Sequence, residues 1–213
     1  MKKVIYLPKI LVLAMSLLPV VSQAAFVLDT GTPTGTGGPL VISSSSLVAA
    51  EFSITSAEDI TQLSAYLAPG TGNGNSLIFE IFSSSNFTGS HSAKTLDGST
   101  TATFSGTTGW TSANVNIELS TPGSYWFVIQ GNGVGTQFDA PLETSATTGT
   151  VPAAEFAFSS NSGSSYAATT SGIGLEVSAV AVPEPAPYGI IAGLGLLALV
   201  ICAPRMQKRP SVS

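Results

Sequence analysis

The chain has 213 residues, of which 12 are acidic and 7 basic, and charged side chains make up only 9% of it. This length allows one domain of ordinary size together with targeting segments. The charge is unevenly distributed, because residues 25–187 hold all 12 acidic residues and one basic residue, Lys94, for a net charge of −11. A body with one cation cannot neutralise phosphates, which argues against nucleic acid and anionic lipid surfaces as its partners.

The N-terminal segment, residues 1–24, has the pattern of a secretory signal peptide. Two lysines follow the initiator methionine, an apolar run covers Ile10–Leu18, and the small residues of "VVSQAA" come after a proline. A charged start, a short apolar run and small residues at the end are the three parts of such a signal. Ser22 and Ala24 fit the small positions before a cleavage site, so we expect a cut after Ala24. An uncleaved membrane anchor is the alternative, although the apolar run is short for a span.

The body, residues 25–181, has the pattern of strands joined by turns rich in Gly, Asn and Pro. Three segments alternate apolar and polar residues, which is typical of strands with one face in a core and one in water. Their apolar residues are Phe52 and Ile54, then Val115, Ile117 and Leu119, then Ile173, Leu175, Val177 and Ala179. The best candidate for a helix, "SAEDITQLSAYL", is short and polar. We therefore predict an all-β fold, a single antiparallel β-sandwich or jelly-roll domain.

Two further segments, "SLIFEIF" and "SYWFVIQ", are apolar on both faces, which predicts strands in the middle of a sheet. In the second, the residues expected on one side are Tyr125, Phe127 and Ile129, and those on the other side are Trp126 and Val128. Residues 25–46 are rich in Gly, Thr and Pro and show no alternation. We expect an irregular lead-in there, with the compact fold starting near Leu47.

The body offers no recognisable set of catalytic residues. His91, the only histidine, lies in the turn-rich "GSHSAK", and no G-x-S-x-G motif marks a nucleophile, so a Ser–His–Asp triad is not indicated. Cys202, the only cysteine, falls in the C-terminal apolar run, which leaves too few ligands for zinc and no disulfide framework. We predict a protein that is not an enzyme and has no cofactor and no metal site. Scattered carboxylates at Glu58–Asp59, Asp97 and Asp139 leave calcium as an alternative.

Three aromatic residues raise the alternative of sugar binding. Trp110, Tyr125 and Trp126 could stack on pyranose rings, but aromatic residues within strands more often pack inside a core. We expect packing for this group. Trp110 is expected to be the most exposed of them and is therefore the candidate sugar contact.

The C-terminal segment, residues 182–209, combines a glutamate between prolines, an apolar run and a basic end. Gly189–Ala203 has 15 residues without a charge, and as a helix it reaches only about 22 Å against about 30 Å of bilayer hydrocarbon. We expect a short transmembrane helix that is a marginal anchor. The basic residues Arg205, Lys208 and Arg209 follow it, which places the tail in the cytoplasm and the body outside.

The start of this segment resembles a PEP-CTERM sorting signal. The motif residues are Val182, Pro183, Glu184 and Pro185, and the short apolar run and basic end follow them. The prolines remove backbone donors and favour an extended, accessible peptide. The resemblance implies that exosortase, a membrane enzyme of exopolysaccharide-producing Gram-negative bacteria, recognises the motif, cuts the tail and passes the protein to the cell surface.

The body resembles bacterial choice-of-anchor domains, surface β-sandwiches that attach through varied tails. The similar parts run from "LVAAEFSITS" to "SLIFEIFS" and continue in "LSTPGSYWFVIQ". This resemblance implies a sandwich with a surface role and brings no catalytic residues. Together, the features predict an exported, non-enzymatic cell-surface or extracellular-matrix protein whose partners are exosortase, the membrane and exopolysaccharide. The alternative is a carbohydrate-binding module or adhesin that acts on exopolysaccharide.

Overall fold

The computed structural model of the chain describes residues 23–34, 39–72, 74–84, 87–88, 94–141 and 149–182. The chain divides into two compact units, Met1–Ala181 and Val182–Ser213. Apart from Val182, the second unit lies outside the described residues, and with it the expected transmembrane helix and basic end. Within the ranges that are described, no helix has the length and apolar character needed to cross a membrane.

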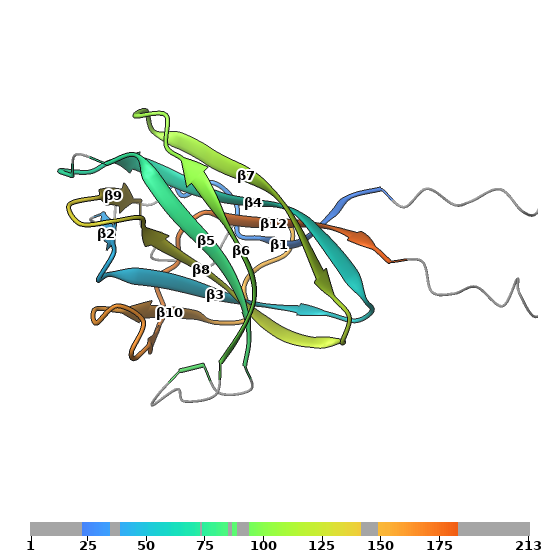
Figure 1. The fold of residues 1–213 in the computed structure, drawn as a ribbon. Coiled ribbons are helices and arrows are strands. Elements are labelled where there is room, and N and C mark those ends of the chain that lie inside the picture. The colour runs from blue at the N-terminus through green and yellow to red at the C-terminus, as the bar shows by residue number, and fades with distance from the viewer. Residues whose placement is uncertain are drawn as a thin grey trace, which may run out of the picture. The chain divides into compact units, whose positions relative to one another are not determined.

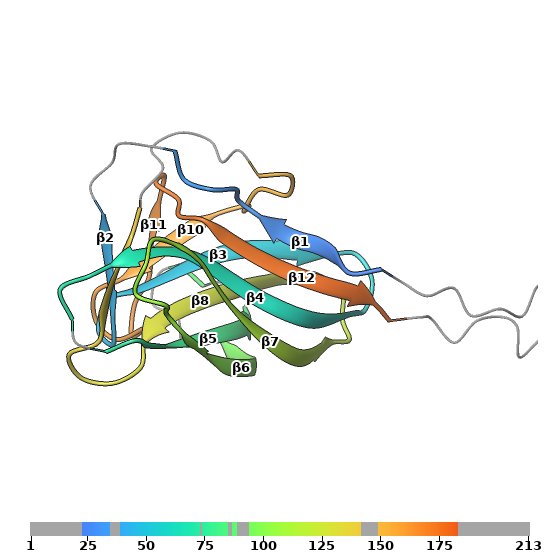
Figure 2. The same cartoon turned by 90° about the horizontal axis from the view of Figure 1, so that it is seen from above.

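The described part of the first unit consists of two antiparallel sheets stacked as separate layers (Figures 1 and 2). In the first sheet the strands follow the order β1 (Ala25–Asp29), β12 (Leu175–Ala181), β4 (Glu58–Pro69), β9 (Gln137–Ala140) and β2 (Leu40–Ser43), and β7 (Gly109–Leu119) also pairs with β4. In the second sheet the order is β11 (Ala167–Thr169), β10 (Phe156–Ser159), β3 (Leu47–Ile54), β8 (Gly123–Gly131), β5 (Ser76–Ser83) and β6 (Thr95–Thr103). The predicted all-β class and the sandwich-like arrangement are confirmed.

The main hydrophobic core lies between the two sheets. Its buried members include the apolar residues named above from the three alternating segments except Val115, which is half-buried and packs against the core. Strand β8 contributes to two cores, because Tyr125, Phe127 and Ile129 face the other sheet while Trp126 and Val128 join a second apolar cluster. The expectation for this central strand is confirmed, since β8 lies between β3 and β5.

The second apolar cluster covers the face of the second sheet that is turned away from the first. Its members are Leu47, Ala49, Phe82, Phe87, Trp126, Val128, Ala157 and Tyr166. We call these residues the outer cluster. Phe87 and Tyr166 come from connections outside the strands. Because their aromatic rings are buried in the cluster, they hold these connections against the sheet.

The expected irregular lead-in is wrong, because residues 25–46 contain both β1 and β2. Strand β1 pairs with β12, with Ala25 opposite Ala179, and β2 pairs with β9. Two close hydrogen bonds extend the contact beyond β1: the Thr30 hydroxyl donates to the Ile173 carbonyl oxygen at 2.7 Å, and the Leu175 amide donates to the Thr30 hydroxyl at 2.7 Å. These strands are short and find partners far along the chain, so local alternation does not reveal them.

The segment considered as a helix candidate forms β4. Ile60, Leu63, Ala65 and Leu67 are all buried in the main core. The pairing register shifts between Ile60 and Gln62, and such a bulge adds a residue to one strand. The bulge therefore turns the spacing of two between core residues into a spacing of three, which resembles helical periodicity.

Candidate functional site

The two ends of the described body leave the sandwich on neighbouring strands. Ala25, the first residue of β1, pairs with Ala179 near the end of β12. Ala24 of the expected cleavage site is exposed, and Val182 of the sorting motif is half-buried directly after β12. The other predicted processing residues lie outside the described residues: Ser22, Pro183, Glu184, Pro185, Arg205, Lys208 and Arg209.

The three aromatic residues considered for sugar binding lie in different places. Tyr125 is only 6% exposed in the main core and Trp126 only 2% exposed in the outer cluster. Trp110 is half-buried at the start of β7 and meets Tyr66 of β4 edge to face, with 5.6 Å between ring centroids and 79° between ring planes. Of the three, Trp110 is the least buried, and its ring contact among the described residues is the edge-to-face one with Tyr66.

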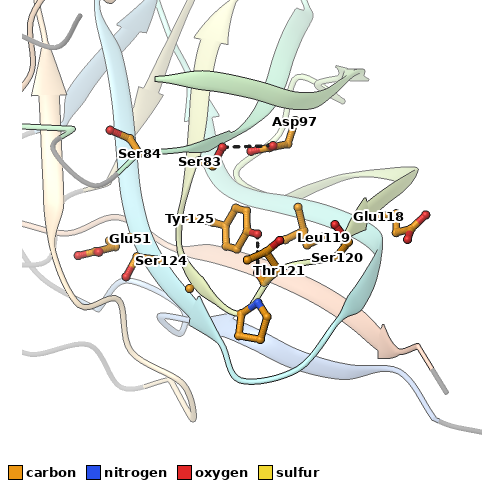
Figure 3. A pocket seen from close by; sticks show the side chains of 12 residues that line it. Glu51, Ser83, Ser84, Asp97, Glu118, Leu119, Ser120, Thr121, Ser124 and Tyr125 are labelled. Carbon is orange, nitrogen blue, oxygen red and sulfur yellow. Dashed lines mark hydrogen bonds between the residues drawn. The ribbon is translucent and has the colours of Figure 1, made fainter. Parts of the chain in front are cut away.

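A cleft of about 620 Å³ opens beside the turn that joins β7 to β8 (Figure 3). Its lining residues are Glu51, Ser83, Ser84, Asp97, Glu118, Leu119, Ser120, Thr121, Pro122, Gly123, Ser124 and Tyr125. They come from β3, β5, β6, the end of β7, the turn and the start of β8. The sheet register accounts for their meeting, because Tyr125 pairs with Phe52 of β3 on one side and with Ser83 of β5 on the other.

Two hydrogen bonds hold the wall of the cleft in place. The Tyr125 hydroxyl donates to the Thr121 carbonyl oxygen at 2.7 Å, which fixes the turn against β8. The Ser83 hydroxyl donates to an Asp97 carboxylate oxygen at 3.3 Å, across β5 and β6. In Figure 3, Tyr125 lies in the middle of the lining, and the side chains of Glu51 and Glu118 point away from it on opposite sides. Burial, and secondarily the charge of Asp97, raise the pKa of Tyr125, so this phenol stays protonated at neutral pH.

The only lysine of the body lies over the outer cluster. The Lys94 ammonium is 5.0 Å, 5.8 Å and 4.9 Å from the ring centroids of Phe82, Phe87 and Tyr166. It also donates a hydrogen bond to the Gly163 carbonyl oxygen at 3.0 Å. Burial lowers the pKa of Lys94, because desolvation disfavours the charged form. These contacts give Lys94 a role in packing the loops onto the sheet.

The carboxylates considered for calcium are not gathered at one place. Glu58 and Asp59 begin β4, Asp97 lies on β6 of the other sheet, and Asp139 lies on β9 opposite Ala68. Among the side chains that the structure describes, no group of three or more His, Cys, Asp or Glu is placed to hold a metal ion. His91 is outside the described ranges.

Asp97 was considered from the sequence as a calcium ligand, and the cleft that it lines was not predicted. Glu51 lies on β3 and Glu118 on β7, and their place in the same lining as Asp97 depends on strand order rather than on a spacing in the chain. The proline and glycine of the β7–β8 turn were the available local signal, since such turns often carry binding residues. No known family model matches this chain, and no curated protein matches it significantly.

Proposed function

We propose that this chain is an exported, non-enzymatic cell-surface or extracellular-matrix protein of a Gram-negative bacterium. In this proposal residues 1–24 are a signal peptide, Gly189–Ala203 is a short transmembrane helix, and exosortase recognises the motif at 182–185. The body between these signals is a β-sandwich that is displayed outside the cytoplasm.

The observation that carries the proposal is where the described body begins and ends. Strand β1 starts at Ala25, one residue after the expected signal-peptide cut, and β12 ends at Ala181, one residue before the motif. Ala181 is still paired, opposite Glu58 of β4. The strands therefore occupy the full length between the two expected processing points. Cleavage at both points would remove no strand from the sandwich.

The experiment is an intact-mass measurement on protein extracted from the surface of the producing cells. We expect an N-terminus at Ala25 and a mass that lacks the residues after the sorting motif. Replacing the motif carboxylate in Glu184→Gln should leave the tail attached and the protein in the membrane fraction. The matched control is Glu176→Gln, which changes a half-buried carboxylate on β12 and should be processed as the wild type is. Surface protein that still carries the residues past Arg205 would contradict the proposal.

A second candidate function is carbohydrate binding, and the cleft beside the β7–β8 turn is the observation that favours it. Trp110 is a half-buried aromatic residue on the other sheet and offers a separate point of contact. A glycan array with the full-length chain and Trp110→Ala distinguishes these two places. Loss of binding in Trp110→Ala would assign the contact to β7, and unchanged binding would favour the cleft.

A further inference from the structure

Strand β1 is an edge strand at the start of the body, so it can leave the first sheet without breaking any other strand pair. It lies beside β12 at the edge of that sheet (Figure 2), and β12 is the only described strand that pairs with it. Strand β12, in contrast, is enclosed between β1 and β4. Without β1 the body therefore keeps two paired sheets, and the first of them has an open edge along β12.

The contacts of β1 define which segment fits this edge. Leu28 is fully buried in the main core, and its place in the register is opposite Val177 of β12. The Thr30 hydroxyl, directly after β1, donates to the Ile173 carbonyl oxygen and accepts from the Leu175 amide, both at 2.7 Å. These two backbone groups are buried, and a buried polar group that loses its partner is unfavourable. An empty edge would therefore favour a strand that restores the same contacts.

Asp29 adds an anchor between the leucine and the threonine. One of its carboxylate oxygens accepts hydrogen bonds from the Thr150 amide at 2.9 Å and from the Thr150 hydroxyl at 2.7 Å. Its backbone amide donates to the Val151 carbonyl oxygen at 2.7 Å. The edge therefore recognises leucine, aspartate and threonine in this order. Every copy of the chain carries such a segment at residues 28–30.

The connection after β1 is long enough to reach a neighbouring copy. Nine residues, 31–39, lie between Thr30 and the start of β2, and four of them are glycine. Nine extended residues span about 30 Å, and glycine permits many backbone conformations. A connection of this length and composition allows β1 to dock on β12 of an adjacent copy while β2 stays in its own sheet.

We propose that β1 is exchanged between copies of this protein, so that β1 of one copy completes the first sheet of a second copy. The second copy then receives Leu28, Asp29 and Thr30 from its neighbour, in the contacts that a single copy makes within itself. Because the contacts are the same in both states, exchange of an identical element is a low-cost route to association. The inference goes beyond the proposed function: at a cell surface or in a matrix, the exchanged strand links neighbouring copies.

The test detects a disulfide that can form only when β1 of one copy lies on β12 of another. Both copies carry Cys202→Ser, which removes the only cysteine of the full-length chain. One copy also carries Phe26→Cys on β1, and a differently tagged copy carries Ser178→Cys on β12. These two positions are opposite each other in the register, as a disulfide requires. The two copies are produced in one strain, extracted in mild detergent and oxidised, and the linked heterodimer is measured on non-reducing gels.

Leu28→Ala gives strand exchange a signature that general destabilisation lacks. In the copy with Phe26→Cys, it should lower the heterodimer yield by at least about tenfold, because truncation of a buried leucine lets the second copy's own β1 compete better for the edge. In the copy with Ser178→Cys, the same substitution should raise the yield, because that copy holds its own β1 less tightly. The matched control is the pair Ser64→Cys and Ser112→Cys, whose hydroxyls are 2.9 Å apart across β4 and β7. This pair should link within a doubly substituted chain and not between two copies.

Two results would overturn the inference. A heterodimer yield no higher than that of the β4–β7 control pair would show that β1 stays in its own copy. A change in the same direction, or no change, when Leu28→Ala is placed in either copy would show that the link does not come from strand exchange. Exosortase takes no part in this measurement, so a processed protein that does not exchange β1 overturns the exchange alone. An unprocessed protein that exchanges β1 overturns the sorting proposal alone.

Discussion

The outer cluster should contribute a large share of the stability of this domain, and Phe87 is the residue that tests it. Its ring lies stacked on Trp126, with 4.3 Å between centroids and 9° between planes, and it is also 4.3 Å from the ring of Tyr166. Only 2% of Phe87 is exposed. The perturbation is Phe87→Ala, which removes this ring from the middle of the cluster.

The magnitude follows from burial and ring contacts. Burying a phenylalanine side chain is worth about 1.5–3 kcal/mol, and an aromatic pair adds about 0.5–1.5 kcal/mol. Replacement of buried phenylalanine by alanine costs about 3–5 kcal/mol in protein cores. Because Phe87 comes from a connection outside the strands, we expect the lower end, a loss of about 3 kcal/mol in the free energy of unfolding.

The assay is urea unfolding of the full-length chain in mild detergent, followed by tryptophan fluorescence. The chain has two tryptophans, so a Trp110→Phe background leaves Trp126 as the reporter. Removal of the Phe87 ring should lower the unfolding midpoint and shift the native emission to longer wavelength, because Trp126 loses its cover. Phe26→Ala is the control: Phe26 is 44% exposed, and its loss should change stability by less than about 0.5 kcal/mol. A loss below about 1 kcal/mol in Phe87→Ala, with unchanged emission, would refute the reasoning.

Two further predictions concern pH and packing. Burial is the largest cause that raises the folded-state pKa of Glu80 and of Glu176 above the ordinary value of 4.5. The folded chain therefore binds protons before the unfolded chain does, so stability should rise as the pH falls from 7 toward about 5. Urea midpoints at both pH values measure this change in stability. The prediction would be contradicted if the midpoint of the wild type did not change with pH, or if the midpoint of the double variant Glu80→Gln, Glu176→Gln rose as much as that of the wild type. In Gly98→Ala the new Cβ would lie 2.5 Å from Cγ1 of Ile117, so overpacking should cost about 1–3 kcal/mol. Thermal unfolding tests this against the exposed Ser99→Ala, and equal melting temperatures would show that Ile117 can move aside.

Only part of the candidate site could be predicted from local sequence patterns. Trp110 was expected to be the most exposed of the three aromatic residues, and its partial exposure agrees with that expectation. The cleft could not be anticipated, since Glu51, Asp97 and Glu118 are separated by long stretches of chain. Strand order places them along the lining of one cleft, and strand order depends on which edges pair.

The sequence by itself determined the class of this fold and the faces of its clearest strands. Alternation in the segments that became β7 and β12 identified core residues such as Ile117 and Val177, because side-chain direction in a strand repeats every two residues whatever its partner. The sequence also predicts the two terminal signals, whose meaning depends on local order of charged, apolar and small residues.

Only the tertiary structure decided which strands pair, and therefore where β1, β2 and the cleft lie. Strand β1 is held by β12 from the opposite end of the body, and its few residues show no alternation long enough to detect. The bulge in β4 shifted its core residues out of the two-residue period. In both cases the stabilising hydrogen bonds and buried contacts come from residues distant in sequence, which no local window contains.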